Sequence, residues 1–103
     1  MEKIKALYLF LDETADSTKH KATVETPSVI LTVVGVSSPE VSAQTAKQFI
    51  QEGKAELVEL CGAHGYGGAK VVYDAIGDQA PVGMIVHQFD NAPKICELIK
   101  KWG

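Results

Sequence analysis

The sequence contains no arginine, and all ten of its basic residues are lysines. Arginine supplies the planar fork of donors that binds phosphates and base edges through two hydrogen bonds at once. Without that fork, and without a basic stripe, the chain is not expected to bind nucleic acid. The net charge is a mild −3. Phosphoryl-transfer enzymes commonly use arginine to stabilise the charge of the transferred group, and this chain has no arginine for that role.

Long hydrophobic runs and paired cysteines are missing as well. The apolar run near the N-terminus extends only from Ala6 to Leu11, which is too short for the core of a signal peptide. No segment reaches the length of a membrane span. Cys61 and Cys96 form no CxxC pair, so neither a disulfide scaffold nor a zinc ribbon is indicated. These absences predict a cytoplasmic protein with free thiols and no membrane partner.

What is present is the composition of a globular protein. The chain has 103 residues, of which 46% are hydrophobic and 22% are charged. This length and balance are typical of one domain with a real core, and we expect residues 1–103 to form a single domain.

Apolar periodicity divides most of the chain into alternating strands and helices. Ser38 is a good N-cap, Pro39 suits the first helical position, and Gly53 suits the position after the last turn. The patterns predict strands over 4–11, 28–36, 55–60 and 81–87, and helices over 39–52, from 69 to 76 and from 91 onward.

The alternation from residue 28 onward is typical of right-handed βαβ units. It predicts a small α/β domain with a mainly parallel four-stranded sheet and helices on its faces; a ferredoxin-like α+β fold is the alternative. The strand runs show little polar alternation, which is typical of strands covered on both faces. Residues 12–27 leave two interpretations: a short helix over 17–22, or an extra edge strand over 22–26 that pairs antiparallel with 29–35.

Ligands of parallel sheets bind beyond the carboxyl ends of the strands. The segment "LCGAHGYGGAK" (60–70) follows one such strand and holds four of the nine glycines. Its backbone amides and the helix start beside it suit a small anion, although a sharp structural turn explains the glycines equally well. The segment does not match a P-loop, because Gly68 stands where that motif has lysine. It does not match the dinucleotide-binding fingerprint either, because Lys70 stands where the third glycine is required. The residues predicted to bind a small anionic ligand are Gly62, Ala63, Gly65, Tyr66, Gly67, Gly68 and Asp12.

Three further residues are candidates for acid–base chemistry: Glu59, His64 and His87. Glu59 falls inside a strand expected to be buried, where it acts as a general base, pairs with a lysine such as Lys70, or lies near an edge and reaches water. His64 stands in the glycine-rich loop and His87 ends the fourth strand. Either histidine is a candidate acid, base or hydrogen-bond donor to a ligand. No HxH, HxxxH or HExxH spacing supports a metal site, and the sequence does not determine whether a cofactor binds. Cys61 is either an activated thiolate or a packing residue.

Three stretches carry a resemblance: "ETPSVILTVVGV", "VELCGAHGYGGAKVVYDAIG" and "PVGMIVHQFD". Together they resemble a family of short prokaryotic proteins of about 100 residues that is catalogued as a domain of unknown function. The resemblance implies a small α/β domain and transfers no activity, cofactor or catalytic residue.

Two functions are compatible with these residues. The first is binding of a compact anion at 62–68, with or without a proton-transfer step that uses Glu59 or a histidine as base. The second is a non-catalytic oligomeric subunit that serves structure or interaction. A homo-oligomer is expected under either, because a sheet this small leaves open edges and has difficulty covering its apolar faces.

Overall fold

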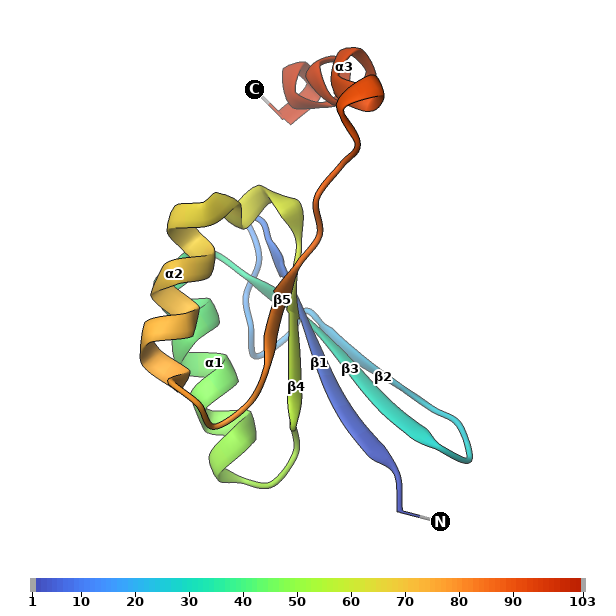
Figure 1. The fold of residues 1–103 in the computed structure, drawn as a ribbon, viewed down its shortest axis with the longest axis vertical. Coiled ribbons are helices and arrows are strands. Elements are labelled where there is room, and N and C mark those ends of the chain that lie inside the picture. Colours follow the sequence, from blue (N-terminus) through green and yellow to red (C-terminus); the bar gives the residue numbers. More distant parts are fainter. Residues whose placement is uncertain (1, 103) are drawn as a thin grey trace.

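The computed structural model describes residues 2–102. Within them, five strands form one sheet in the order β2-β3-β1-β4-β5 (Figure 1). The strands are β1 (Ile4–Leu11), β2 (Lys21–Glu25), β3 (Val29–Val36), β4 (Leu57–Leu60) and β5 (Val82–Met84). All neighbouring pairs are parallel except β2 and β3, which are antiparallel. The mainly parallel α/β prediction is confirmed, including the additional antiparallel edge strand.

The alternative helix over 17–22 is wrong. The Oδ1 atom of Asp16 accepts hydrogen bonds from the backbone N and the Oγ1 of Thr18, at 2.9 and 2.6 Å. This local turn competes with helix formation, as short polar side chains commonly do. The chain then enters β2. Thr23 of β2 lies opposite Thr32 of β3, with their hydroxyl oxygens 3.2 Å apart.

Three α-helices follow the strands: α1 (Pro39–Gln51), α2 (Gly65–Ile76) and α3 (Ala92–Trp102). The hydroxyl of Ser38 caps α1 by accepting a hydrogen bond from the amide of Val41 at 3.2 Å. Gly53, with φ of +71°, lies just beyond the helix end. α2 begins four residues earlier than predicted, because it continues from a short 3-10 helix, η1 (Gly62–His64). None of these helices combines the length and apolar character needed to cross a bilayer.

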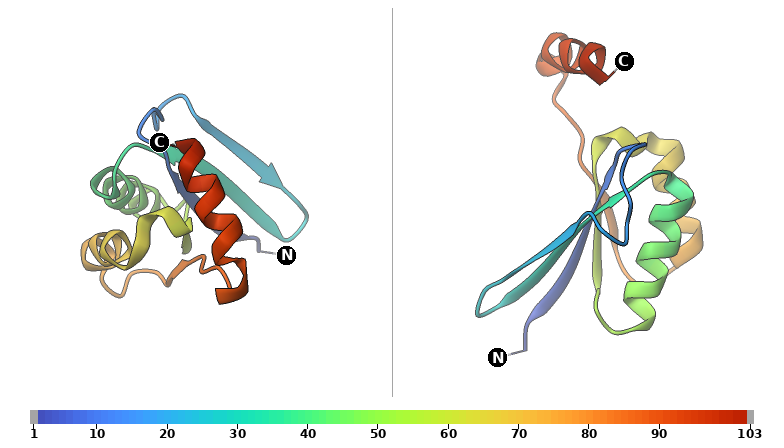
Figure 2. Two further views of the ribbon diagram at one scale, coloured as in Figure 1. Left: turned by 90° about the horizontal axis from the view of Figure 1, so that it is seen from above. Right: turned by 180° about the vertical axis from the view of Figure 1, so that it is seen from behind.

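α1 and α2 lie side by side over one face of the sheet, and the core is between these two layers (Figures 1 and 2). Alternation along β1 directs Leu7 and Leu9 toward the helices, where both are fully buried. Partners from the neighbouring strands and the two helices complete the core: Val34, Val36, Val58, Leu60, Ala46, Val72 and Ile76.

The opposite face of the sheet carries no helix among the described residues, as the right-hand view of Figure 2 shows. We call it the open face. Residues paired in register point to the same side, so Tyr8 shares this face with Val33 of β3 and Glu59 of β4. The open face comprises Ile4, Ala6, Tyr8, Phe10, Ala22, Val24, Val29, Leu31, Val33, Gly35, Leu57, Glu59 and Gly83.

One uncovered face differs from the expectation that both faces are covered. Two features explain the difference. The connection from β1 to β3 contains β2 in place of a helix, and α3 stands beyond the end of the sheet (Figure 1). No residue of α3 is buried, and Trp102 is 72% exposed.

Candidate functional site

The predicted convergence of loops takes place at the carboxyl ends of β1, β3, β4 and β5, which lie at one edge of the sheet. Asp12, in the loop after β1, has its side chain bonded within that loop. Its Oδ1 accepts hydrogen bonds from the backbone N and Oγ1 of Thr14, at 2.9 and 2.8 Å. These bonds stabilise the carboxylate and lower the pKa of Asp12. Asp12 thus closes its own loop.

The glycine-rich loop is a short 3-10 turn that runs directly into α2. The amide of His64 donates to the carbonyl of Cys61 at 3.1 Å, and the amide of Gly65 donates to the carbonyl of Gly62. Gly65 has a φ of +63°, a conformation that L side chains rarely adopt. Gly65 is therefore needed for the backbone conformation of the turn.

Gly68 serves packing. A methyl group added at Gly68 would lie 3.1 Å from the Cβ of His64 and 3.3 Å from the Cγ of Pro39. α2 therefore approaches the start of α1 closely at this position. Gly67 and Tyr66 lie on the exposed outer side of α2, and Tyr66 lines a separate hollow between α2 and β5.

His64 is buried beneath the loop, with both ring nitrogens in contact with polar atoms. Its Nε2 lies 2.7 Å from the Oγ of Ser42 in α1. Its Nδ1 lies 3.1 Å from the carbonyl oxygen and 3.4 Å from the Sγ of Cys61. Burial lowers the pKa of His64, which favours the neutral imidazole. The ring thereby joins the start of α2 to α1.

Glu59 lies on the open face, half-buried between Tyr8 and Gly83. Its Oε2 is 2.6 Å from the position of a methyl group added at Gly83, so the carboxylate covers that glycine. Lys70 pairs instead with Asp74, at 2.6 Å, and the alternative that paired it with Glu59 is wrong. Within residues 2–102, the Glu59 carboxylate has no hydrogen bond or ion pair.

A pocket of about 630 Å³ lies at the carboxyl edge of the sheet, between the ends of β1 and β4, the segment after β5, and α3. We call it the edge pocket. Among the residues predicted from the sequence as site residues, it gathers Gly62, Ala63 and His87. Its full lining is Tyr8, Cys61, Gly62, Ala63, Ile85, His87, Ile95, Leu98, Ile99, Lys101 and Trp102.

Gly62 allows two distant segments to meet at this pocket. A methyl group added there would lie 3.0 Å from the carbonyl oxygen of Ile85 and 3.7 Å from the Cδ2 of His87. The chain after β5 therefore passes close to the loop, and the imidazole of His87 lies beside it. Within residues 2–102, the amides of Gly62 and Ala63 have no hydrogen-bond partner.

Cys61 and Tyr8 form the wall of the edge pocket on the side of the sheet. The Sγ of Cys61 accepts a hydrogen bond from the amide of Leu11 at 3.1 Å. Burial, and to a smaller extent the nearby Cys61, raise the pKa of the Tyr8 hydroxyl. The sequence analysis did not identify Tyr8, Ile85, Lys101 or Trp102 as site residues. Alternation along β1 was the available signal for Tyr8, since it directs that ring away from Leu7 and Leu9.

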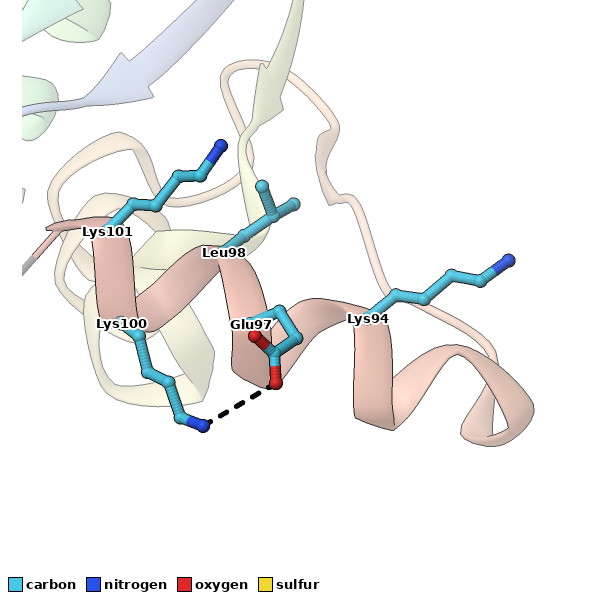
Figure 3. Close-up of a pocket in the computed structure, with 5 residues that line it drawn as sticks. All are labelled: Lys94, Glu97, Leu98, Lys100 and Lys101. Atoms are coloured by element: carbon cyan, nitrogen blue, oxygen red, sulfur yellow. Dashed lines mark hydrogen bonds and ion pairs between the residues drawn. The ribbon is translucent and has the colours of Figure 1, made fainter.

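A second hollow, of about 560 Å³, lies along α3 and is lined by Leu98 and charged side chains. Figure 3 shows Lys100 paired with Glu97, at 3.5 Å, whereas Lys101 and Leu98 project from another side of the helix. This hollow contains none of the predicted site residues. Among residues 2–102, no group of three or more His, Cys, Asp or Glu side chains is arranged to hold a metal ion.

Comparison with known proteins gives a family and no individual relative. Neither a curated protein nor a solved structure matches the chain. The family described as "Family of unknown function (DUF6506)" matches residues 4–99. The chain belongs to this family.

Proposed function

We propose that the edge pocket binds a small organic anion, with its charged group at the amides of Gly62 and Ala63. The observation that carries the proposal is the meeting, in one pocket, of these two unpaired amides with the His87 imidazole and an apolar wall.

The electrostatics of the loop favour an anion. Gly62 begins the short 3-10 turn η1, and the first amides of such a turn have no partner within it and present their N–H groups outward. Carboxylates and phosphates bind at such positions through backbone N–H groups. Lys101 on α3 adds a full positive charge at the pocket. His64 is buried, which lowers its pKa and favours the neutral ring, and it holds the loop in place through Ser42.

The size and lining favour an organic ligand over a bare inorganic anion. Pockets for small molecules range from about 300 to 1,000 Å³ and combine apolar walls with a few polar groups. The edge pocket has a volume of about 630 Å³, with Tyr8, Ile85 and Trp102 among its apolar side chains. A ligand with a carboxylate and a small apolar body matches both parts.

A catalytic form of this proposal uses a proton transfer. His87 is the imidazole that lines the pocket, and an imidazole both accepts and donates protons near neutral pH. Glu59 lies on β4, two residues before Cys61, but does not line the edge pocket, so the catalytic form of the proposal rests on His87. His64 supports this chemistry indirectly, by orienting the loop.

Titration of the ¹⁵N-labelled protein with benzoate tests the proposal, with benzyl alcohol and inorganic phosphate as comparison probes. We expect saturable shifts of the Gly62 and Ala63 amides with benzoate, and weaker binding of both comparison probes. Removing the imidazole contact, in His87→Ala, should weaken benzoate binding by about tenfold. His20→Ala, which alters a histidine outside the pocket, should leave it unchanged. Shifts that do not saturate, or that are centred on other residues, would contradict the proposal.

The open face favours a second candidate function, that of a non-catalytic oligomeric subunit. An apolar sheet face and an apolar helix stripe that are both exposed are typical of interaction surfaces. This function predicts that variants of Gly62 and His87 leave the assembly intact, and that surface variants of the open face disrupt it. Sedimentation velocity of the two classes of variant distinguishes this function from anion binding at the edge pocket.

A further inference from the structure

We infer that two copies of the chain form a dimer in which α3 of each copy lies on the open face of the other. The first observation is that one chain carries two apolar surfaces without partners. On α3, Leu98, Ile99 and Trp102 are 57%, 54% and 72% exposed and Ile95 is half-buried, although all four line the edge pocket of their own chain. On the sheet, Ile4 and Val24 of the open face are 54% and 60% exposed.

The dimensions of the two surfaces suit each other. Eleven residues of α-helix are about 16 Å long. Five strands spaced at about 4.8 Å give a face roughly 20 Å wide. A helix about 10 Å in diameter therefore fits on the face and covers about half its width. If α3 folded back on its own sheet, half of the open face would stay exposed. A second copy covers the face with its α3 and places the rest of its chain beside that helix.

The area is sufficient for a stable dimer. Half the lateral surface of a helix of this size is about 250 Å², and two reciprocal contacts bury four such surfaces. The total is about 1,000 Å² from the helices and the sheet areas beneath them, which is roughly the area expected of a biological interface. Reciprocal exchange of one element between identical chains is a common route to a symmetric dimer.

The charges on the two surfaces are complementary. Glu59 is the one charged residue among those that the strand register assigns to the open face, and it has no partner within residues 2–102. Lys101 projects beside Leu98 at the border of the apolar stripe (Figure 3), and no ion pair occupies it within the same residues. A helix from the second copy supplies Lys101 to Glu59, which leaves neither charge unpaired on contact.

The connection to α3 allows the exchange. The amide of Ile85 makes the last bond of β5 to β4, at 2.9 Å to the carbonyl of Leu60. The chain then leaves the sheet, with Val86 65% exposed and Gln88 in an extended conformation. In the dimer, Tyr8, Cys61, Gly62, Ala63 and His87 keep their places at the edge pocket, whereas the α3 residues that line it in the single chain move to the open face of the second copy.

The test uses charge reversal and mixing of full-length chains. In Glu59→Lys, both contacts of the dimer place the new lysine against Lys101 of the other copy. In Lys101→Glu, both contacts place the new glutamate against Glu59. Each variant alone should dimerise at least about tenfold more weakly than the wild type. When the two variants are mixed, the heterodimer has two different contacts. One joins the two new side chains, which are a lysine and a glutamate, and the other joins the original Glu59 and Lys101. Both contacts then join opposite charges, so the affinity should return.

Controls separate this result from its alternatives. Lys100→Glu changes a lysine on another side of α3 and should leave the dimer intact. Leu98→Asp, within the stripe, should give a monomer by sedimentation equilibrium. If the wild type stays monomeric at the highest concentration that sedimentation equilibrium can follow, or if mixing restores nothing while the double variant in one chain does, the exchange between copies is wrong. A monomer that still binds benzoate at Gly62 would overturn the dimer and leave the proposed function standing.

Discussion

The Nε2 atom of His64, at the end of η1, lies 2.7 Å from the Oγ atom of Ser42 in α1, and both residues are buried. These are the two buried polar residues of the described chain. Their contact joins the loop that floors the edge pocket to the helix layer, so the position of the loop depends on a polar pair inside an otherwise apolar core.

Removing the hydroxyl tests how much this contact contributes. In Ser42→Ala the Nε2 atom of His64 stays buried without a partner, and an unsatisfied buried polar group costs about 1–3 kcal/mol. We expect the free energy of unfolding in urea to fall by that amount. Ser37→Ala, at an exposed serine before α1, should change it by less than about 0.5 kcal/mol. Equal stability of the two variants would show that His64 does not depend on Ser42.

The same pair predicts a pH dependence of stability. Burial lowers the pKa of His64 below its ordinary value of 6.5. Below pH 6.5 the unfolded chain therefore takes up a proton that the folded chain does not, and stability falls as the pH falls toward the folded-state pKa. Above pH 6.5 this contribution is fully present.

Urea unfolding of wild type and His64→Gln across this range measures the effect. Glutamine keeps a polar contact for Ser42 but does not titrate, so the difference in stability between the two proteins should shrink on acidification. The depressed pKa of Asp12 acts in a separate window, because its contribution is present above pH 3.8 and is lost below it. A constant difference between the two proteins from neutral pH down to the acidic side of the His64 transition would contradict the prediction.

The glycines of the loop should respond in opposite directions to alanine. Gly65 has a φ of +63° and a ψ of 179°, a region populated almost only by glycine, and open space surrounds it, so the cost of Gly65→Ala is conformational and about 1–3 kcal/mol. Gly67 has open space and no positive φ, and it lies in the first turn of α2. Gly67→Ala should stabilise the protein by about 0.5–1 kcal/mol through the higher helix propensity of alanine. Thermal unfolding followed by circular dichroism compares the two, and shifts of the same sign would refute this assignment.

The sequence was sufficient for features that local chemistry determines. The capping chemistry at Ser38 and Gly53 predicted α1 to within one residue, and unbroken apolar runs predicted β1 and β3 almost residue for residue. β4 and β5 are shorter than predicted, at 57–60 and 82–84. β5 is an edge strand with β4 as its neighbour, so the short β4 limits the length of both.

Features that depend on tertiary contacts could not be predicted. The burial of His64 requires Ser42, which is 22 residues away on another helix. Asp12 lies at the shared edge, as expected from the sequence, but its own loop satisfies its carboxylate through Thr14. The apolar face of α3 was visible as a stripe, yet periodicity shows only that a surface requires cover and not which surface provides it.

The close approach of Gly62 to the chain after β5 makes a final prediction. In Gly62→Ala the new methyl group would meet the carbonyl oxygen of Ile85 at 3.0 Å, which is backbone and has little freedom to yield. The segment must move outward, and overpacking of this kind costs about 1–3 kcal/mol. The bond from the amide of Ile85 to Leu60 should weaken, so hydrogen exchange at Ile85 should accelerate while the core amide of Leu9 exchanges as before. Benzoate binding should weaken too, because His87 moves with the segment. Ala63→Ser, at an exposed neighbour in the same turn, serves as the control for the exchange measurement alone; if Gly62→Ala leaves exchange at Ile85 as slow as this control does, the two segments do not depend on the glycine for their contact.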